Sequence, residues 1–126
     1  MSDRINKNDV ELALWRSGLI KEGARPMHVE SAAKDIARAS NTLRRISVEK
    51  CNGVPHWNQR LQLIESRLDE SDVERHEKQE STARADLERA ARDVLRRGLV
   101  FKFYTDPRAG VACRISNRAN TKDCFV

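Results

Sequence analysis

One apolar stripe, between Met27 and Cys51, constrains the fold more than any other part of the sequence. Its positions alternate in steps of three and four residues, the spacing of one face of an α-helix. These positions are Val29, Ala32, Ile36, Ala39, Leu43 and Ile46. Because two of them are alanine, a partner helix can approach closely. The stripe therefore predicts a long helix that packs along its length against a second helix.

Signals for the start and end of a helix flank this stripe. Pro26 suits the first turn, because a helix leaves its first N–H groups without partners and proline has none. Asn52-Gly53 is a typical helix terminator, and Pro55 follows two residues later. We expect the helix to end there, close to Cys51.

A shorter helix is predicted upstream, from Asp9 to Ser17. Asn8 and Glu11 have the spacing of a capping box, and Gly18 suits a left-handed stop. We expect its large apolar side chains on one buried face: Val10, Leu14 and Trp15.

A long charged helix should follow the stripe helix. Apolar stepping runs from Trp57 to Leu68, and Ser71 with Glu74 forms a second capping box. The helix therefore restarts or kinks at Ser71, or else continues through it. His76–Thr82 contains no apolar residue and is expected to project into solvent. Stepping resumes before a stop at Gly98, at Ala83, Leu87, Ala90, Ala91, Val94 and Leu95.

After Gly98 the apolar period changes to two, which is typical of β-strands. Leu99–Tyr104 and Val111–Ser116 alternate in this way, and Asp106–Gly110 between them has turn chemistry. We expect a two-stranded β-hairpin whose apolar face lies on the helices, since an isolated hairpin is marginally stable.

The predicted fold is α+β and mostly helical. Antiparallel helices form a coiled-coil-like hairpin, and the two-stranded β-hairpin follows at the C-terminal end. A chain of 126 residues fits a single domain, here residues 1–126. Segments 1–7 and 117–126 show no periodicity, and we expect them to be loosely ordered.

Charge is distributed unevenly along the chain. Residues 1–60 hold eleven Lys/Arg against seven Asp/Glu, residues 61–97 eight against ten, and residues 98–126 five against two. The basic excess thus lies towards the two ends, which permits an anionic partner. No apolar run is long enough to span a membrane and the first residues do not resemble a secretory signal, so we expect a cytoplasmic protein without a membrane partner.

Few residues offer catalytic or metal-binding chemistry. Cys51, His56, Cys113 and Cys124 are a conceivable ligand set, but zinc sites normally contain a closely spaced cysteine pair, and buried thiols are the simpler interpretation. Cys51 near His56 is the one local candidate for a nucleophile and its base. Phosphate-binding loops and hydrolase signatures are missing from the sequence. We expect neither an enzyme nor a cofactor.

Basic residues give the candidate binding sites. Arg38, Arg44, Arg45 and Lys50 on the stripe helix could contact phosphates. The hairpin and the residues after it carry a second group, Lys102, Arg108, Arg114, Arg118 and Lys122. A turn with Arg108 near its tip has the shape of a ribbon that could enter a nucleic-acid groove. The simpler alternative is a solvated charged surface.

Two motifs resemble those of a group of small phage and prophage accessory proteins. In that group a helix ending in Cys-Asn-Gly precedes a hairpin carrying Asp-Pro-Arg-Gly. Here Cys51-Asn52-Gly53 matches the first motif, and Asp106-Pro107-Arg108 matches the second with Ala109 before the glycine. Some members carry a cysteine-rich insertion, which this sequence lacks. The resemblance implies a phage or mobile-element protein that acts on host or phage machinery, and it implies no specific activity.

The sequence thus leads to the hypothesis of a non-enzymatic phage-type accessory protein in the cytoplasm of a bacterial host. Its partner would be a host or phage protein or a nucleoprotein complex, as for an inhibitor of a CRISPR or restriction defence. Direct binding of nucleic acid through the basic helix and hairpin surfaces is the alternative. An alanine-rich stripe also suits a homodimer.

Overall fold

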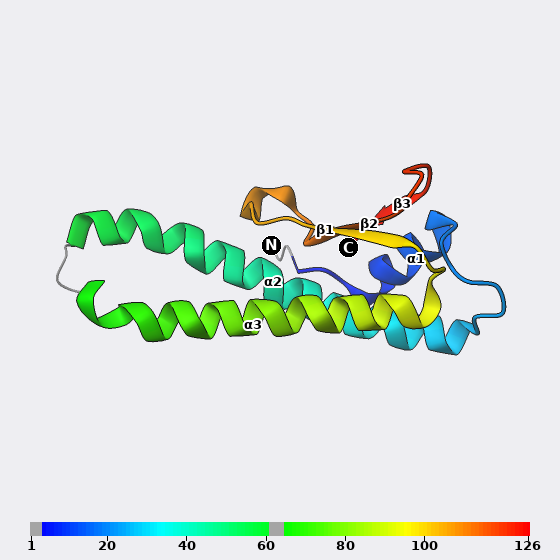
Figure 1. Cartoon of the computed structure of the whole chain (residues 1–126), viewed down its shortest axis with the longest axis horizontal. Helices are drawn as coiled ribbons and strands as arrows, with labels where there is room; N and C mark the ends of the chain where they lie inside the picture. Colours follow the sequence, from blue (N-terminus) through cyan, green and yellow to red (C-terminus); the bar gives the residue numbers. More distant parts are fainter. Residues whose placement is uncertain (1–3, 61–64) are drawn as a thin grey trace.

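Two long antiparallel helices form the body of the protein, and a short helix and a small sheet gather at one end of them (Figure 1). This computed structural model describes the backbone of residues 4–60 and 65–126 and the side chains of residues 4–50 and 74–126. The helices are α1 (Lys7–Ser17), α2 (Pro26–Arg60) and α3 (Glu65–Val94). The strands β1 (Leu99–Phe103), β2 (Cys113–Asn117) and β3 (Asp123–Phe125) form an antiparallel sheet in the order β1-β2-β3. The predicted α+β, mostly helical fold is confirmed.

The predicted stripe packs α2 against α3. All six stripe positions are buried, and so are all six apolar positions predicted for the second half of α3. Alanines are buried on both helices: Ala32, Ala33, Ala37 and Ala39 on α2, and Ala83, Ala90 and Ala91 on α3. Small side chains allow the two backbones to lie close together along the shared length.

Helix α2 is longer than predicted. It begins at Pro26 as expected, but it continues through Gly53 and Pro55 to Arg60. Glycine and proline in a helix interior cost about 1 and 3 kcal/mol, which disfavours a helix without forbidding it. Here the antiparallel partner α3 runs beside α2 to the far end of the hairpin (Figure 1). The prediction of a stop near Cys51 is therefore wrong.

Helix α3 also differs from its predicted bounds. The run predicted from Trp57 to Leu68 is divided between α2 and α3, and its residues 61–64 lie outside the described residues. No restart occurs at Ser71, which lies inside α3.

The C-terminal end of α3 comes four residues earlier than predicted, at Val94 instead of Gly98. The cause is a backbone contact with the segment after α1. Lys21 N donates to Val94 O at 2.9 Å, and Arg96 N donates to Leu19 O at 2.8 Å. These bonds replace the next helical turn and direct the chain into β1.

Helix α1 begins earlier than predicted. Its N-cap is Asn6, whose side chain accepts from Asn8 N at 2.7 Å, so the predicted capping box at Asn8 is wrong. Gly18 ends the helix in the left-handed conformation, as expected. Trp15 is 44% exposed and not part of the core. At 100° per residue it lies well round the helix from its buried neighbour Leu14.

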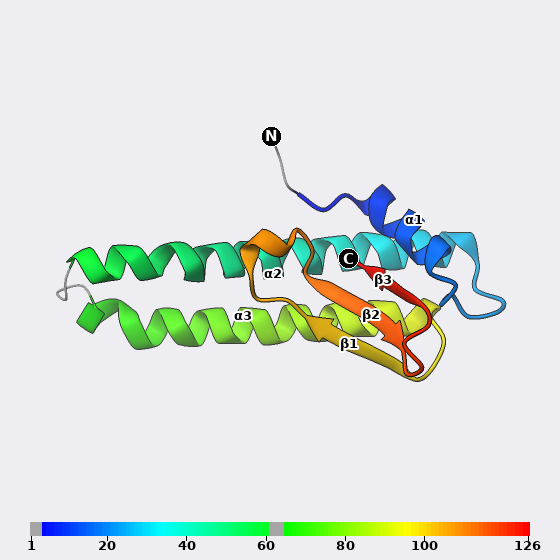
Figure 2. The ribbon, with the colours of Figure 1, turned by 90° about the horizontal axis from the view of Figure 1, so that it is seen from above.

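The sheet covers one face of the helical hairpin near the start of α2 and the end of α3 (Figures 1 and 2). Cys113, Ile115 and Cys124 on its inner face are buried. Phe101 and Phe103 lie half-buried at the side of α3, where two arginines cover their rings. Arg92 Cζ lies 5.1 Å from the Phe101 ring centroid, and Arg84 Cζ lies 5.1 Å from that of Phe103. Such cation–π contacts hold β1 against α3.

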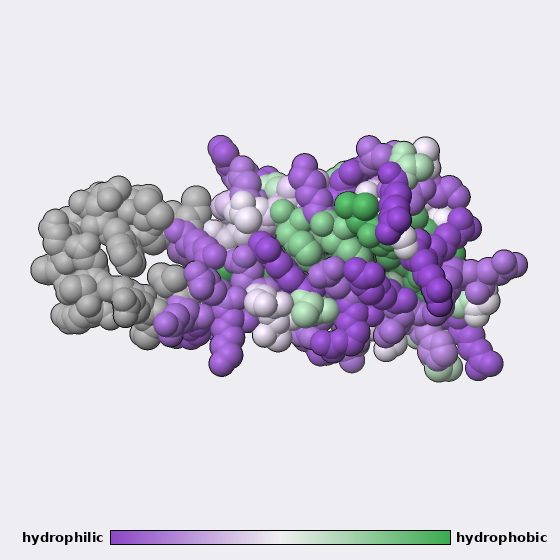
Figure 3. Space-filling model, viewed as in Figure 1, coloured by the Kyte–Doolittle hydropathy of each residue, from purple (hydrophilic) through white to green (hydrophobic). Residues whose placement is uncertain are grey.

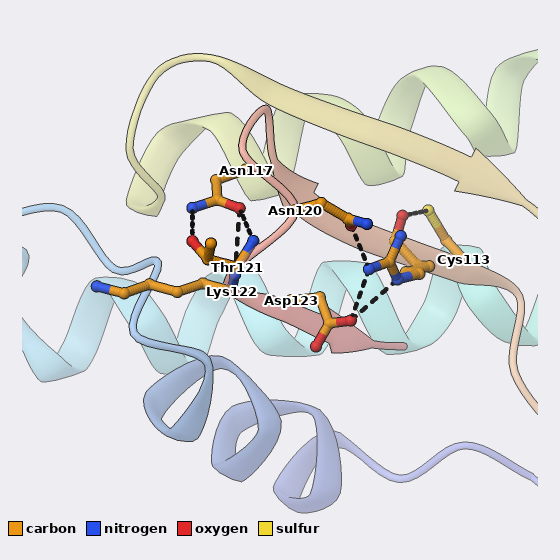
Figure 4. Close-up of polar contacts among 7 residues, drawn as sticks. Cys113, Asn117, Asn120, Thr121, Lys122 and Asp123 are labelled. Carbon is orange, nitrogen blue, oxygen red and sulfur yellow. Dashed lines mark hydrogen bonds and ion pairs between the residues drawn. The ribbon is translucent and has the colours of Figure 1, made fainter.

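The segment 117–126, predicted to be loosely ordered, instead folds back as a tight turn and the third strand (Figure 4). Asn117 Oδ1 accepts from Thr121 N at 2.9 Å and Lys122 N at 3.1 Å. Arg114 also pairs with Asp123 at 2.9 Å. The prediction missed this strand because three residues are too few to show an alternating pattern.

The turn between β1 and β2 contains a short 3-10 helix, η2 (Pro107–Ala109). Asp106 caps it by accepting from Arg108 N at 2.9 Å, and Gly110 ends it at a φ of 77°, as the turn chemistry predicted. Among the described residues, no helix is both long enough and apolar enough to cross a bilayer.

Candidate functional site

A basic groove of about 1250 Å³ runs along α2, between the N-terminal segment and η2. Its basic lining residues come from the N-terminal end of the chain (Arg4 and Lys7) and from α2 (Lys34, Arg38, Arg44 and Arg45). Glu49 is the one acidic residue among its lining residues, while apolar contacts come from Ile5, Ala37, Val48 and Pro107. We call this feature the basic groove. Its composition suits an elongated polyanion better than a small neutral ligand.

The N-terminal wall of the basic groove is held by Asn41. Ile5 N donates to Asn41 Oδ1 at 2.8 Å, and Asn41 Nδ2 donates to Ile5 O at 2.9 Å. Ile5 itself packs against the core cluster. This two-point contact places Arg4 and Lys7 beside α2, although the segment precedes α1 in the chain. Residues 4–7 are therefore ordered by α2, contrary to the loosely ordered end that we expected.

One ion pair reduces the positive charge at this wall. Lys7 Nζ lies 2.8 Å from Glu30 Oε1. The hydrogen bond that Lys7 donates to Glu30 raises the pKa of Lys7, and the same bond lowers the pKa of the Glu30 carboxyl. Lys7 is half-buried and Glu30 is exposed, and an incoming phosphate can compete with the carboxylate for the ammonium group.

A second groove, of about 810 Å³, lies between α2 and α3 on the other side of a ridge formed by Arg38, Thr42 and Arg45. Those three residues line both grooves. The second groove also contains bases and acids in mixture: Arg75, Lys78 and Arg89 with Asp35, Asp86 and Asp93. We call it the mixed-charge groove. Asp86 pairs with Arg89 at 3.0 Å, so part of its charge is already satisfied.

Three of the predicted basic residues, Arg38, Arg44 and Arg45, line the basic groove and a fourth lies at its rim. Arg44 is half-buried and Arg45 is exposed, and both line the groove. Arg108 directly follows Pro107, a lining residue, and is exposed. Arg108 also pairs with Asp106 at 3.1 Å, and this hydrogen bond lowers the pKa of the Asp106 carboxyl.

Lys50 has a different role. Its ammonium lies 2.8 Å from Glu80 Oε2, and Arg84 contacts the other oxygen of the same carboxylate at 2.8 Å. This triad joins α2 to α3. Near it, His76, which we expected to be solvated, lies 3.0 Å from Glu49 Oε2. The polar segment 76–82 is otherwise largely exposed, as predicted.

The remaining predicted residues lie on or beside the sheet, away from the basic groove. Lys102 is directly opposite Arg114 in the β1–β2 register. Arg114 is paired with Asp123, and the Lys102 ammonium lies 5.6 Å from the Tyr104 ring centroid. Arg118 is exposed in the turn after β2. The predicted basic set is therefore divided between two surfaces.

Three basic residues of the basic groove were missing from the predicted site: Arg4, Lys7 and Lys34. For Lys34 the signal was available, because Lys34, Arg38 and Arg45 recur at spacings of four and seven residues on one helical face. For Arg4 and Lys7 there was no such signal, because a contact across 36 residues of sequence positions them.

Cys113 and Cys124, on neighbouring strands, are buried free thiols. Burial raises the pKa of each thiol to about 12, so both are protonated at neutral pH. No group of three or more metal-ligating side chains occurs in the part of the chain with described side chains. Cys51 and His56, the other members of the conceivable ligand set, have side chains outside that part.

Comparison with known proteins adds no relative: no protein-family model, no curated protein and no solved structure matches this chain.

Proposed function

We propose that this protein is a non-enzymatic binding protein whose target is a nucleic acid or a nucleoprotein complex, contacted through the basic groove. The observation that carries this proposal is the lining of that groove, where six basic side chains meet a single acidic one. Phosphates along a nucleic-acid backbone present the matching charge at regular spacing, and neutralising them releases bound counterions.

Position and shape support the same proposal. Arg38 and Arg45 form the ridge between the two grooves, so basic groups continue across α2 towards Arg75 and Lys78 of α3. A continuous basic tract over an elongated helical surface suits a backbone that passes across the molecule. Protonated, buried thiols are poor nucleophiles, so Cys113 and Cys124 are unsuited to covalent catalysis.

The mixed-charge groove favours a second candidate, a protein target. Its alternating acids and bases offer ion pairs to another protein surface, and the exposed polar residues Lys78 and Gln79 line it. An inhibitor of a host defence complex of the CRISPR or restriction type, the role suggested by the resemblance to phage accessory proteins, would combine both surfaces on one nucleoprotein target.

Fluorescence anisotropy with short random-sequence duplex DNA, single-stranded DNA and RNA tests the proposal. We expect binding at low salt that weakens steeply as salt rises, with a Kd of about 1–100 µM near physiological salt for sequence-independent contacts. An absence of binding to all three probes at low salt would rule out the nucleic-acid reading. A second measurement compares binding to a defence complex that retains its nucleic acid with binding to the same complex after its nucleic acid is removed. Equal binding to both would indicate a protein target, and binding only to the first would indicate a nucleoprotein target.

A further inference from the structure

Strand β1 is an edge strand of the sheet. The sheet order β1-β2-β3 gives β1 a single strand neighbour among the described residues. In Figure 2, β1 forms the border of the sheet above α3. In Figure 3, hydrophobic surface is visible above α3, in the region where Figure 1 places β1. The strand reads Leu-Val-Phe-Lys-Phe, and its apolar side chains remain partly accessible.

The β1–β2 register determines which backbone groups point outward. Tyr104 N donates to Ala112 O at 2.9 Å, which marks the hydrogen-bonded pairs of this ladder. Because such pairs alternate in an antiparallel ladder, Val100 and Lys102 direct their backbone groups towards β2. The backbone N–H and C=O groups of Leu99, Phe101 and Phe103 therefore point towards the outer edge of the sheet.

Natural proteins protect such edges with proline, bulges, very short strands, exposed charges (lysine above all) or charges that point inward. Strand β1 has five residues and no proline, and Lys102, exposed on the outer face of the sheet, is its one charged residue. The rings of Phe101 and Phe103 are held on the α3 side by Arg92 and Arg84. A row of backbone groups of this kind is complementary to another β-strand.

We propose that the outer edge of β1 pairs with β1 of a second copy of this chain, antiparallel and centred on Phe101, to form a continuous six-stranded sheet across a two-fold axis. Such an interface is self-complementary, because each strand presents the same surface to the other. This centre gives all five residues of each strand a partner, and it places Phe101 opposite its own copy.

The charge pattern favours this register. Pairing centred on Phe101 sets Leu99 opposite Phe103 of the second copy on the helix-facing side. On the outer side it sets Val100 opposite Lys102, so no two like charges are directly opposed. A shift that centres the pair on Lys102 would oppose two ammonium groups, which is destabilising. The proposal concerns a surface separate from the basic groove, and it does not depend on nucleic-acid binding.

Substitutions at Val100 test the register, because Val100 of each copy lies opposite Lys102 of the other. The two-fold axis therefore makes every substitution act at two pairs. Val100 is 48% exposed, so changes there leave the core of a single chain intact. Val100→Lys opposes Lys102 with a like charge, while Val100→Glu opposes it with the opposite charge. The Val100→Lys/Lys102→Glu double variant restores an attractive pair with the positions of the charges exchanged.

Analytical ultracentrifugation of the full chain over a range of concentrations gives the dimer dissociation constant. We expect dimer formation by the unmodified chain, about two- to thirtyfold weaker for Val100→Lys and about two- to thirtyfold tighter for Val100→Glu. The double variant should recover the dimer lost in Val100→Lys, while circular dichroism verifies that every variant is folded. A chain that stays monomeric at all concentrations overturns the proposal. So does a dimer whose dissociation constant responds identically to the lysine and glutamate substitutions, because then a different surface joins the two copies.

Discussion

Asn41, in the middle of α2, forms two reciprocal hydrogen bonds with the backbone of Ile5, at 2.8 and 2.9 Å. A side chain that satisfies both the N–H and the C=O of one residue acts as a substitute for a strand neighbour. It fixes the N-terminal segment against α2, and it thereby completes one wall of the basic groove. The groove is thus a tertiary feature, assembled from segments that are far apart in the sequence.

Replacing Asn41 with alanine should loosen that wall. Loss of two partly buried hydrogen bonds is expected to lower the free energy of unfolding by about 1–3 kcal/mol. Polyanion binding should weaken as well, because Arg4 and Lys7 are no longer held beside α2. Urea unfolding and fluorescence anisotropy measure the two effects. Asn8→Ala, at an exposed position of α1, is the matched control and should change stability by less than about 0.5 kcal/mol. Equal effects of the two substitutions would show that the contact does not anchor the segment.

A leucine pair tests the position of the core. Leu87 on α3 is fully buried, whereas Leu12 on α1 is 47% exposed. Leu87→Ala should lower the free energy of unfolding by about 2–5 kcal/mol, because a cavity remains between α3 and its neighbours. Leu12→Ala should cost less than about 0.5 kcal/mol. Denaturant unfolding of both variants makes the comparison, and similar losses at the two positions would contradict the packing described above.

The two buried thiols predict a loss of stability at alkaline pH. Burial raises the pKa of Cys113 and Cys124 from 9.0 to about 12 in the folded chain. Between these values the unfolded chain releases the thiol protons while the folded chain retains them, so stability falls as pH rises above about 9. The slope should reach at most about 1.4 kcal/mol per pH unit for each thiol.

Urea unfolding at pH values from 8 upward measures this slope. The Cys113→Ala/Cys124→Ala variant is the control, because every other ionisable side chain is retained in it. Its stability should fall less steeply with pH than that of the unmodified chain. Parallel curves for the two proteins would show that the thiols are not buried as described.

The helical part of the fold could be predicted because burial leaves a periodic signal. Every position of the stripe from Val29 to Ile46 is buried, and the change of period at Gly98 marks the transition from helix to sheet. The errors arose where tertiary contacts override local preference. Gly53 lies inside α2, and the end of α3 is set by the backbone of Leu19 and Lys21. Such contacts leave no local pattern in the sequence.

The candidate site was predictable only in part. Arg44 and Arg45 are adjacent basic residues on a helix predicted with the correct face, and both line the basic groove. Lys50 and Arg114 are basic residues of the same kind, but Glu80 and Asp123 neutralise them in the fold. Composition alone does not show which lysines and arginines come together to line a groove.

The most direct test of the central claim uses two adjacent arginine pairs in the same chain. Arg44 and Arg45 line the basic groove, whereas Arg96 and Arg97, beyond the end of α3, are exposed and line neither groove. Reversing either pair to glutamate changes the net charge equally, so a nonspecific effect of charge would be the same in both variants. Thermal unfolding of each variant verifies that it is folded before binding is compared.

The measurement is the dependence of duplex DNA affinity on salt concentration for the two double variants. Loss of two phosphate contacts should reduce the slope of log K against log salt by about 1.8, with a marked loss of affinity, in Arg44→Glu/Arg45→Glu. The Arg96→Glu/Arg97→Glu variant should keep nearly the slope of the unmodified chain. Equal losses of slope in both variants would contradict the account, because binding would then follow net charge and not the basic groove.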